Sequence, residues 1–296
     1  MTTPAGATPR EIDALTDEMA SVVEEIFDAA SAADGVAPLS EAAVLHVRHA
    51  RGTGPYADFI VGSGDGYAHL DLGDEPEAEL VVHPRARRRG HGRALLDALA
   101  ARAGAGVRVW AHGDLPAAAA LARSAGWTRV RALWQLRRPL SDPLPDVQLP
   151  PGVSLRTFVV GKDEDAWLEV NRRAFAHHPE QGSWTAADLA LREQEPWFDP
   201  DGFLLAERDG RIVGFHWTKI HPDPIGEVYV VGVDPGAQGG GLGRALTVAG
   251  LRYLRSRGLA EVMLYVDEDN QAAVKTYFGL GFTRWSTDVM YAQAPV

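Results

Sequence analysis

Hydrophobic and polar positions follow two patterns along the chain, short β-branched or aromatic runs and longer stretches with a period of three to four residues. The runs 203–208 and 211–219 predict a hairpin, because the intervening Asp209-Gly210 suits a type I′ turn. Later elements of the second half are predicted in the order strand 227–233, helix 241–258, strand 261–266 and helix 270–281. Strands and helices that alternate in this way favour a mixed α/β fold.

The first half repeats the pattern of the second, behind a long acidic segment, 11–33, that predicts a helix. Segments 81–96 and 232–247 align at a constant offset (241 − 90 = 151). A second pair, 116–127 and 271–282, aligns at an offset of 155 (281 − 126). Two echoes in the same order indicate tandem copies of one domain.

A proline-rich segment, Pro139–Gly152, separates the copies and reads as an extended linker. We therefore predict an N-terminal domain over 1–138, a linker over 139–152 and a C-terminal domain over 153–296. The predicted fold class is α/β (mixed α+β), in which each domain has a mixed central sheet flanked by helices.

Composition excludes several classes of protein. Hydrophobic residues make up 46% and charged residues 23% of the 296 residues, as in packed globular proteins. No apolar run approaches the ~20 residues of a membrane helix, so we expect no membrane partner. The net charge of −11, without a basic stripe, argues against nucleic acid. The chain has no cysteine, which excludes disulfides and thiolate metal sites. We expect a cytoplasmic monomer without a metal.

The segment 235–244 carries the clearest chemistry. Its glycines lie between a predicted buried strand and a helix, where backbone N–H groups and the helix N-terminus suit a pyrophosphate. The Walker pattern fails because Arg156 stands where its first glycine belongs, and the G-x-G-x-x-G pattern fails at Leu246. A glycine-rich turn without a ligand is the alternative interpretation.

These motifs resemble a known family. The loop, followed by Asn270, Ala273, Tyr277 and Gly281-Phe282, is similar to the signature of the GNAT superfamily of N-acetyltransferases. Further segments, among them 34–38, 178–182, 197–202 and 214–223, resemble the mycothiol synthase family over nearly the whole chain. The resemblance implies tandem GNAT domains, acetyl-CoA as co-substrate, and acetylation of the cysteinyl amine of the small molecule desacetylmycothiol (Cys-GlcN-Ins). It also implies a pantetheine arm lying in a splay between two strands.

Two residues are candidates for catalysis. An amine attacks a thioester only when neutral, so a base is needed, and Glu227 begins the strand that leads to the acyl site. Tyr277 would protonate the departing CoA thiolate, and a backbone N–H near Val233 would stabilise the thioester oxygen. The alternatives are an exposed strand-end acid for Glu227 and an aromatic core residue for Tyr277.

The resemblance also implies two sets of binding residues. The expected substrate contacts are Glu41, Glu180, Lys219, Glu227 and Tyr265; surface charge is the alternative for Glu41 and Glu180. The expected acetyl-CoA contacts are Leu80, Val81, Val82, Arg88, Arg89, Gly90, His91, Gly92 and Arg93 in copy one, and Val231, Gly232, Val233, Gln238, Gly239, Gly240, Gly241, Leu242, Gly243, Arg244, Asn270, Gln271, Ala272, Ala273, Val274 and Lys275 in copy two.

The two copies are not expected to be equal. At the stated offsets Glu227 falls on Pro76 and Tyr277 on Ala122, so copy one keeps the loop and lacks the acid and the base. We therefore expect catalysis in the C-terminal domain. Two other functions stay open: a tandem acetyltransferase for another small amine such as an aminoglycoside, and a non-catalytic acyl-CoA sensor or scaffold.

Overall fold

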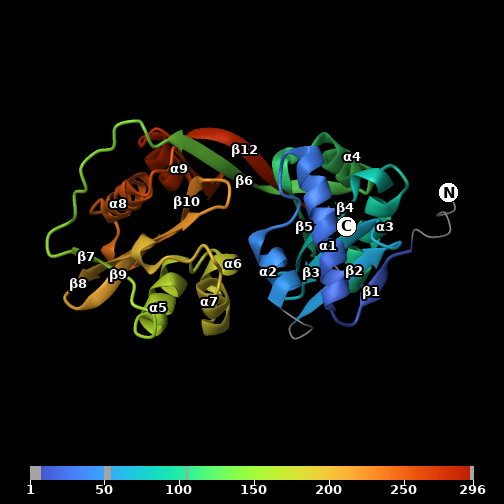
Figure 1. Ribbon diagram of the computed structural model, residues 1–296, viewed down its shortest axis with the longest axis horizontal. Helices are drawn as coiled ribbons and strands as arrows, with labels where there is room; N and C mark the ends of the chain where they lie inside the picture. The colour runs from blue at the N-terminus through green and yellow to red at the C-terminus, as the bar shows by residue number, and fades with distance from the viewer. Residues whose placement is uncertain (1–7, 50–54, 105, 294–296) are drawn as a thin grey trace. The chain divides into compact units, whose positions relative to one another are not determined.

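The computed structural model describes residues 8–49, 55–104 and 106–293, with the side chains of Pro179 and Glu180 outside the description. The chain forms two compact units (Figure 1). Unit 1 comprises Met1–Trp134 and Ser286–Val296, and unit 2 comprises Gln135–Trp285. The proline-rich segment lies inside unit 2, and the division into domains at 139–152 stays a prediction. None of the described helices is long and apolar enough to cross a bilayer.

Unit 1 contains a mixed sheet covered by helices on both faces. Its elements are β1 (Arg10–Ile12), α1 (Asp17–Asp34), α2 (Glu41–His49), β2 (Tyr56–Val61), β3 (Gly66–Asp71), β4 (Glu77–Val82), η1 (Pro84–Ala86), α3 (His91–Ala103), β5 (Arg108–Ala111), η2 (His112–Asp114), α4 (Pro116–Ser124) and the start of β6 (Trp127–Pro139). Neighbouring strands are antiparallel from β1 to β4, and β4 pairs with β5 in parallel. The end of β12 (Thr283–Gln293) pairs with the other edge of β5.

Alternating side chains of the unit 1 strands form two cores. Ile60, Tyr67 and Val81 pack with α1, whereas their chain neighbours Val61 and Ala68 pack with the leucines of α3. Because consecutive strand residues point to opposite faces, α1 and α3 cover opposite sides of the sheet.

Unit 2 repeats this arrangement. Its elements are β7 (Ser154–Thr157), α5 (Glu164–Ala174), α6 (Pro179–Gly182), α7 (Ala186–Glu193), η3 (Pro200–Gly202), β8 (Phe203–Arg208), β9 (Arg211–Ile220), β10 (Ile225–Val233), η4 (Pro235–Ala237), α8 (Leu242–Ser256), β11 (Glu261–Asp267) and α9 (Gln271–Phe278). β7 to β10 are antiparallel neighbours, and β10 pairs with β11 in parallel. Figure 1 shows α5 and α8 on opposite sides of β8 to β10, in agreement with separate apolar clusters around Trp217 and around Leu246.

The predicted hairpin is confirmed and the predicted first helix is wrong at its start. Asp209 and Gly210 both have positive φ, 52° and 72°, as a type I′ turn requires. The acidic helix begins at Asp17, because the hydroxyl of Thr16 accepts a hydrogen bond from the Met19 amide (3.3 Å) and so caps it. Glu11 lies in β1, paired with β2.

Candidate active site

In each unit a glycine immediately precedes a helix, at the position where the sequence predicts a pyrophosphate site. Gly90 precedes α3 with φ 90°, and Gly241 precedes α8 with φ 79°; neither helix start has a side-chain cap. The left-handed conformation favours glycine, and the first N–H groups of each helix remain available to an anion. Arg88 (φ 64°) and Gly239 (φ 86°) also share a left-handed conformation at the offset of 151.

The residues at the beginning of the two loops hold the loops in place. Nε of Arg87 donates to the carbonyl of Val82, and Nε2 of Gln238 donates to the carbonyl of Val233, both at 3.2 Å. Arg87 also makes two hydrogen bonds to the Asp34 carboxylate, at 2.6 and 2.7 Å. The amide of Gln238, predicted to contact acetyl-CoA, thus contacts the backbone of its own loop.

The parallel strand pair of each unit separates before it ends. In the described strands, β10 pairs with β11 from Ile225 to Val228 only, and β4 pairs with β5 from Glu77 to Glu79 only. A register shift between Val228 and Val230 interrupts the β9–β10 ladder at the same level. Because a β-bulge bends its strand, we expect this irregularity to bend β10 where its pairing with β11 stops.

Backbone amides of β10 point into the opening between the strands. The Asp234 N–H donates to the Val213 carbonyl at 3.0 Å, so Gly232 and Asp234 present their N–H groups to β9. By alternation, Val231 and Val233 present theirs toward β11, beyond the last paired residue. In unit 1 the His83 N–H donates to Asp65 at 2.9 Å, which places Leu80 and Val82 in the same role.

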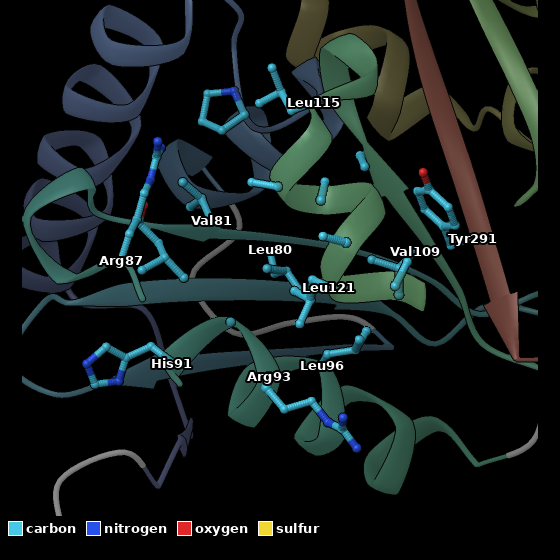
Figure 2. A pocket seen from close by; sticks show the side chains of 18 of the residues that line it. Leu80, Val81, Arg87, His91, Arg93, Leu96, Val109, Leu115, Leu121 and Tyr291 are labelled. Atoms are coloured by element: carbon cyan, nitrogen blue, oxygen red, sulfur yellow. The ribbon is translucent and has the colours of Figure 1, made fainter. Parts of the chain in front are cut away.

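A cavity of about 870 Å³ lies at this opening in unit 1. Figure 2 shows the side chains of Leu80, Leu96, Val109 and Leu121 within it and His91 and Arg93 toward one side. Of the residues predicted for acetyl-CoA in copy one, the lining includes Leu80, Val81, Val82, Arg88, Gly90, His91, Gly92 and Arg93.

In unit 2 the candidate base and its neighbours share one face of the sheet. Glu227 on β10 is only 6% exposed and stands opposite Lys219 on β9. Its Oε2 lies 2.7 Å from Nε2 of His221. Met263 is its partner on β11, so Tyr265, two residues further, lies on the same face. The structure thus brings Glu227, Lys219 and Tyr265 to one side of the sheet.

Aromatic rings surround the cations of this face. Nζ of Lys219 lies 4.4 Å from the Trp197 ring and 5.2 Å from the Tyr229 ring. The Arg192 guanidinium lies 3.8 Å from the Trp184 ring and donates to the Tyr229 hydroxyl at 2.8 Å. These contacts hold both cations against aromatic faces, and Lys219 is the register partner of Glu227.

Tyr277 and Tyr265 occupy different environments. Tyr277 is buried against Phe282, with the ring centroids 5.8 Å apart, and burial raises the pKa of its hydroxyl to about 12. Tyr265 is 41% exposed, and its hydroxyl accepts a hydrogen bond from Gln135 at 2.8 Å. The side chain of Asn270 caps α9 by accepting the Ala273 amide at 3.2 Å. Capping the helix that carries Tyr277 is a structural role for this asparagine.

The remaining predicted substrate residues are less constrained. Glu41 begins α2 in unit 1 and is half-buried. The backbone of Glu180 lies in α6, and its side chain lies outside the described part. Their contacts with substrate stay predictions, as do those of the other predicted site residues.

Two polar clusters in unit 1 were not predicted from the sequence. In the first, Asp58 accepts from His46 (2.7 Å), His69 (2.9 Å) and the Tyr67 hydroxyl (2.5 Å). Burial favours the neutral form of Asp58, but the two histidines outweigh it and hold its pKa well below the usual range. One ligand atom from each of His46, Asp58 and His69 lies within 4.8 Å of the others, so the expected lack of a metal stays a prediction.

The second cluster joins Glu79, His112 and Asp288. Nδ1 of His112 lies 3.0 Å from the Asp288 carboxylate and its Nε2 lies 3.8 Å from that of Glu79. Burial acts to lower the pKa of His112, but the hydrogen bond and charge of Asp288, together with Glu79, raise it to about 10. The sequence around His112 does not indicate this cluster, because its partners Glu79 and Asp288 lie far from it along the chain.

Family models match both halves of the chain. One described as "Acetyltransferase (GNAT) family" matches residues 165–282, and one described as "Acetyltransferase (GNAT) domain" matches residues 55–129. A GCN5-related N-acetyltransferase from Sphaerobacter thermophilus has a similar structure, with a TM-score of 0.68, 26% identity, and coverage of 98% of this chain and 96% of that one. A tandem GNAT protein from the clavulanic acid biosynthesis pathway shares the fold, with a TM-score of 0.69, 22% identity, and coverage of 97% and 99%. The predicted tandem GNAT fold is confirmed.

Curated relatives extend over nearly the full length. The mycothiol acetyltransferase of Thermomonospora curvata is 60% identical over 289 residues, covering 96% of this chain and 96% of its own. That of Thermobispora bispora is 61% identical over 276 residues, covering 90% of this chain and 93% of its own. Together with two GNAT-type units that each hold a glycine-initiated helix beside separating strands, these relatives show that the chain belongs to the mycothiol acetyltransferase family of GNAT acyltransferases.

Proposed function

We propose that the protein transfers the acetyl group of acetyl-CoA to the cysteinyl amine of desacetylmycothiol, giving mycothiol and CoA. The observation that carries this proposal is the identity of 60% and 61%, over nearly the whole chain, to curated mycothiol acetyltransferases. The proposal includes a cytoplasmic, monomeric enzyme with a small-molecule acceptor, without a metal and without a membrane or nucleic-acid partner.

Unit 2 is the proposed catalytic unit. The pyrophosphate of acetyl-CoA binds the N–H groups of the loop before α8, and the pantetheine arm pairs with the amides of Val231 and Val233. A backbone N–H near Val233 stabilises the thioester oxygen as negative charge develops on it. The separation of β10 from β11 supports this placement, because it leaves these amides without a strand partner.

Glu227 is the proposed base. It takes a proton from the cysteinyl ammonium and passes it to solvent. The neutral amine then attacks the thioester carbon, a C–N bond forms, the C–S bond breaks, and the nitrogen loses its second proton to solvent as the amide forms. The burial of its carboxylate beside a separating strand supports this role. Glu41, Glu180, Lys219 and Tyr265 are the proposed contacts to the polar glucosaminyl-inositol.

Tyr277 is the proposed acid that protonates the CoA thiolate. A phenol is protonated at neutral pH, so the hydroxyl can donate; burial, which raises its pKa to about 12, makes the phenol a weaker acid and so does not itself favour the transfer. The thiolate gains the phenolic proton, and solvent returns a proton to Tyr277 after CoA leaves.

Unit 1 is proposed to bind acetyl-CoA without turning it over. Its cavity and its glycine loop support binding. At the offset of 151 Glu227 falls on Pro76, but the extra residue of the β10 bulge moves the equivalence to Glu77: it pairs with Asp71 and Arg108 as Glu227 pairs with Lys219 and Met263. The Glu77 carboxylate accepts from the Arg108 guanidinium (2.7 Å) and the Trp110 indole (3.0 Å), so it is engaged by its own unit. Ala122 stands at the offset of Tyr277, so an acetyl group there meets no equivalent acid.

The test is a direct assay of the purified protein with acetyl-CoA and desacetylmycothiol, with the acetylated product measured by mass spectrometry. An aminoglycoside and other small amines are run in parallel, and a reaction without amine controls for hydrolysis. We expect turnover with desacetylmycothiol and a loss of roughly 10²-fold in Glu227→Gln, which is a typical contribution of a general base. Acetylation of another amine alone would overturn the proposed substrate, and binding of acetyl-CoA without any turnover would indicate a sensor or scaffold.

A further inference from the structure

His221 forms a direct hydrogen bond to the carboxylate that the proposed mechanism uses as its base. Its Nε2 lies 2.7 Å from Oε2 of Glu227, and the two side chains are 22% and 8% exposed. We propose that His221 is a positioning residue for the acetyl transfer: its Nε2–H fixes Oε2 of Glu227, so that Oε1 is the oxygen that takes the proton of the amine. This inference rests on the proposed role of Glu227.

The β9–β10 connection brings the two residues together. β9 ends at Ile220 and β10 begins at Ile225, and the His221 amide donates to the Ile225 carbonyl at 3.0 Å. Lys219 pairs with Glu227 in register, so residues 219, 221 and 227 have a fixed relation to one sheet face. A side chain held this way by its backbone loses little further freedom when it binds the carboxylate.

Carboxylate chemistry fixes the direction of the bond. An ionised carboxylate only accepts, so the imidazole donates from Nε2. A buried carboxylate without such a donor would rotate between equivalent orientations and would favour its neutral form. A donor at one oxygen therefore orients the base and favours the charged form that accepts the proton.

Charged groups from the neighbouring strands complete the environment of the pair. Lys219 faces Glu227 from β9, with its ammonium over the Trp197 and Tyr229 rings. From β11, Met263 stands beside Glu227. Glu261, two residues earlier, pairs with Ile225, and its carboxylate lies 3.2 Å from the Arg137 guanidinium. His221 thus hydrogen-bonds the Glu227 carboxylate directly, among charged groups from the neighbouring strands.

The test compares two substitutions of His221 whose side-chain amides differ in length. Glutamine places its NH₂ near the position of the histidine Nε2, whereas asparagine is too short to reach it. We expect His221→Asn to lower kcat about tenfold, as loss of a hydrogen bond to a charged group predicts, with little change in the KM for acetyl-CoA. The acidic limb of its pH–rate profile should move to higher pH. His221→Gln should keep most of kcat and the wild-type profile, and His177→Asn, at an exposed position, serves as the control.

Several outcomes would overturn the inference. They are an unchanged kcat and pH profile in His221→Asn, or equal losses in the glutamine and asparagine variants. Circular dichroism and acetyl-CoA binding by calorimetry establish that each variant is folded, and His221→Ala, which also removes the donor, takes the place of the asparagine variant if that variant does not fold. Glu227→Gln separates the two proposals: activity in that variant refutes the base itself, whereas its inactivity beside a normal His221→Asn refutes only the positioning role.

Discussion

The stability of unit 1 should fall steeply with pH in the alkaline range because of His112. The folded state holds this imidazole between Asp288 and Glu79 and raises its pKa from 6.5 to about 10. The unfolded chain releases the proton near pH 6.5, so the stabilisation is fully present below that pH and is lost as the pH rises toward 10. Unfolding free energy should therefore decrease across this window.

The size of the effect follows from the shift. A difference between 6.5 and about 10, at about 1.4 kcal/mol per pH unit, gives an upper limit of about 5 kcal/mol. The imidazole side chain is 14% exposed, so solvent screening lowers the effect below this limit. The variant His112→Gln, whose side chain cannot titrate at this position, should lose most of the slope.

Urea unfolding at several pH values from 6 to 10, read by pulsed hydrogen exchange and mass spectrometry, separates the two units. Peptides from β5 report unit 1, and peptides from α8 provide an internal control in unit 2. We expect the midpoint of the β5 peptides to fall with pH in the wild type and to change much less in His112→Gln. A wild-type midpoint that is constant between pH 7 and 9.5, or an equal slope in the variant, would refute the assignment of a protonated His112.

Three further predictions concern the proposed acetyl-CoA sites. Tyr277→Phe removes the hydroxyl and keeps the ring contact with Phe282, so kcat should fall while the melting temperature and the KM for acetyl-CoA stay near wild type. An unchanged kcat, under conditions in which chemistry is rate-limiting, would show that Tyr277 has only a packing role. Position 240 tolerates a side chain, because φ of Gly240 is not positive and an added Cβ would lie 3.6 Å from Pro150. Gly240→Arg adds a cation to the pyrophosphate loop, so the KM for acetyl-CoA should fall roughly two- to fivefold, and the decrease should be smaller in high salt. Gly241→Trp should abolish turnover and Gly90→Trp should spare it in steady-state assays, and the opposite result would move catalysis to unit 1.

The alternation of elements and the two glycine loops could be predicted because each depends on local sequence. Asp209-Gly210 determines its turn through φ alone, and the glycine before α8 is required by a left-handed φ. The start of the first helix could not be placed in this way, because pairing of Glu11 with β2 is a non-local contact that competes with helix propensity.

The candidate site shows the same limit. Glu227 and Lys219 could be named from the family resemblance, but their pairing depends on the register of β9 and β10. His221 was not singled out, since a histidine in a connection has many possible partners. The His112 cluster depends on Asp288, which lies 176 residues further along the chain. A sequence pattern with a period of two or 3.6 residues contains no information about such a contact.

The last strand has a consequence for how the protein can be made. β12 passes from unit 2 into unit 1 at Ser286, and its residues Val289–Ala292 form the edge ladder with β5. A ribosome therefore releases this strand of unit 1 only after unit 2 has been synthesised. An amino-terminal fragment cut at the proline-rich segment would expose the open edge of β5 and lack Asp288, so the two copies of an ancestral duplication can no longer be produced as independent halves.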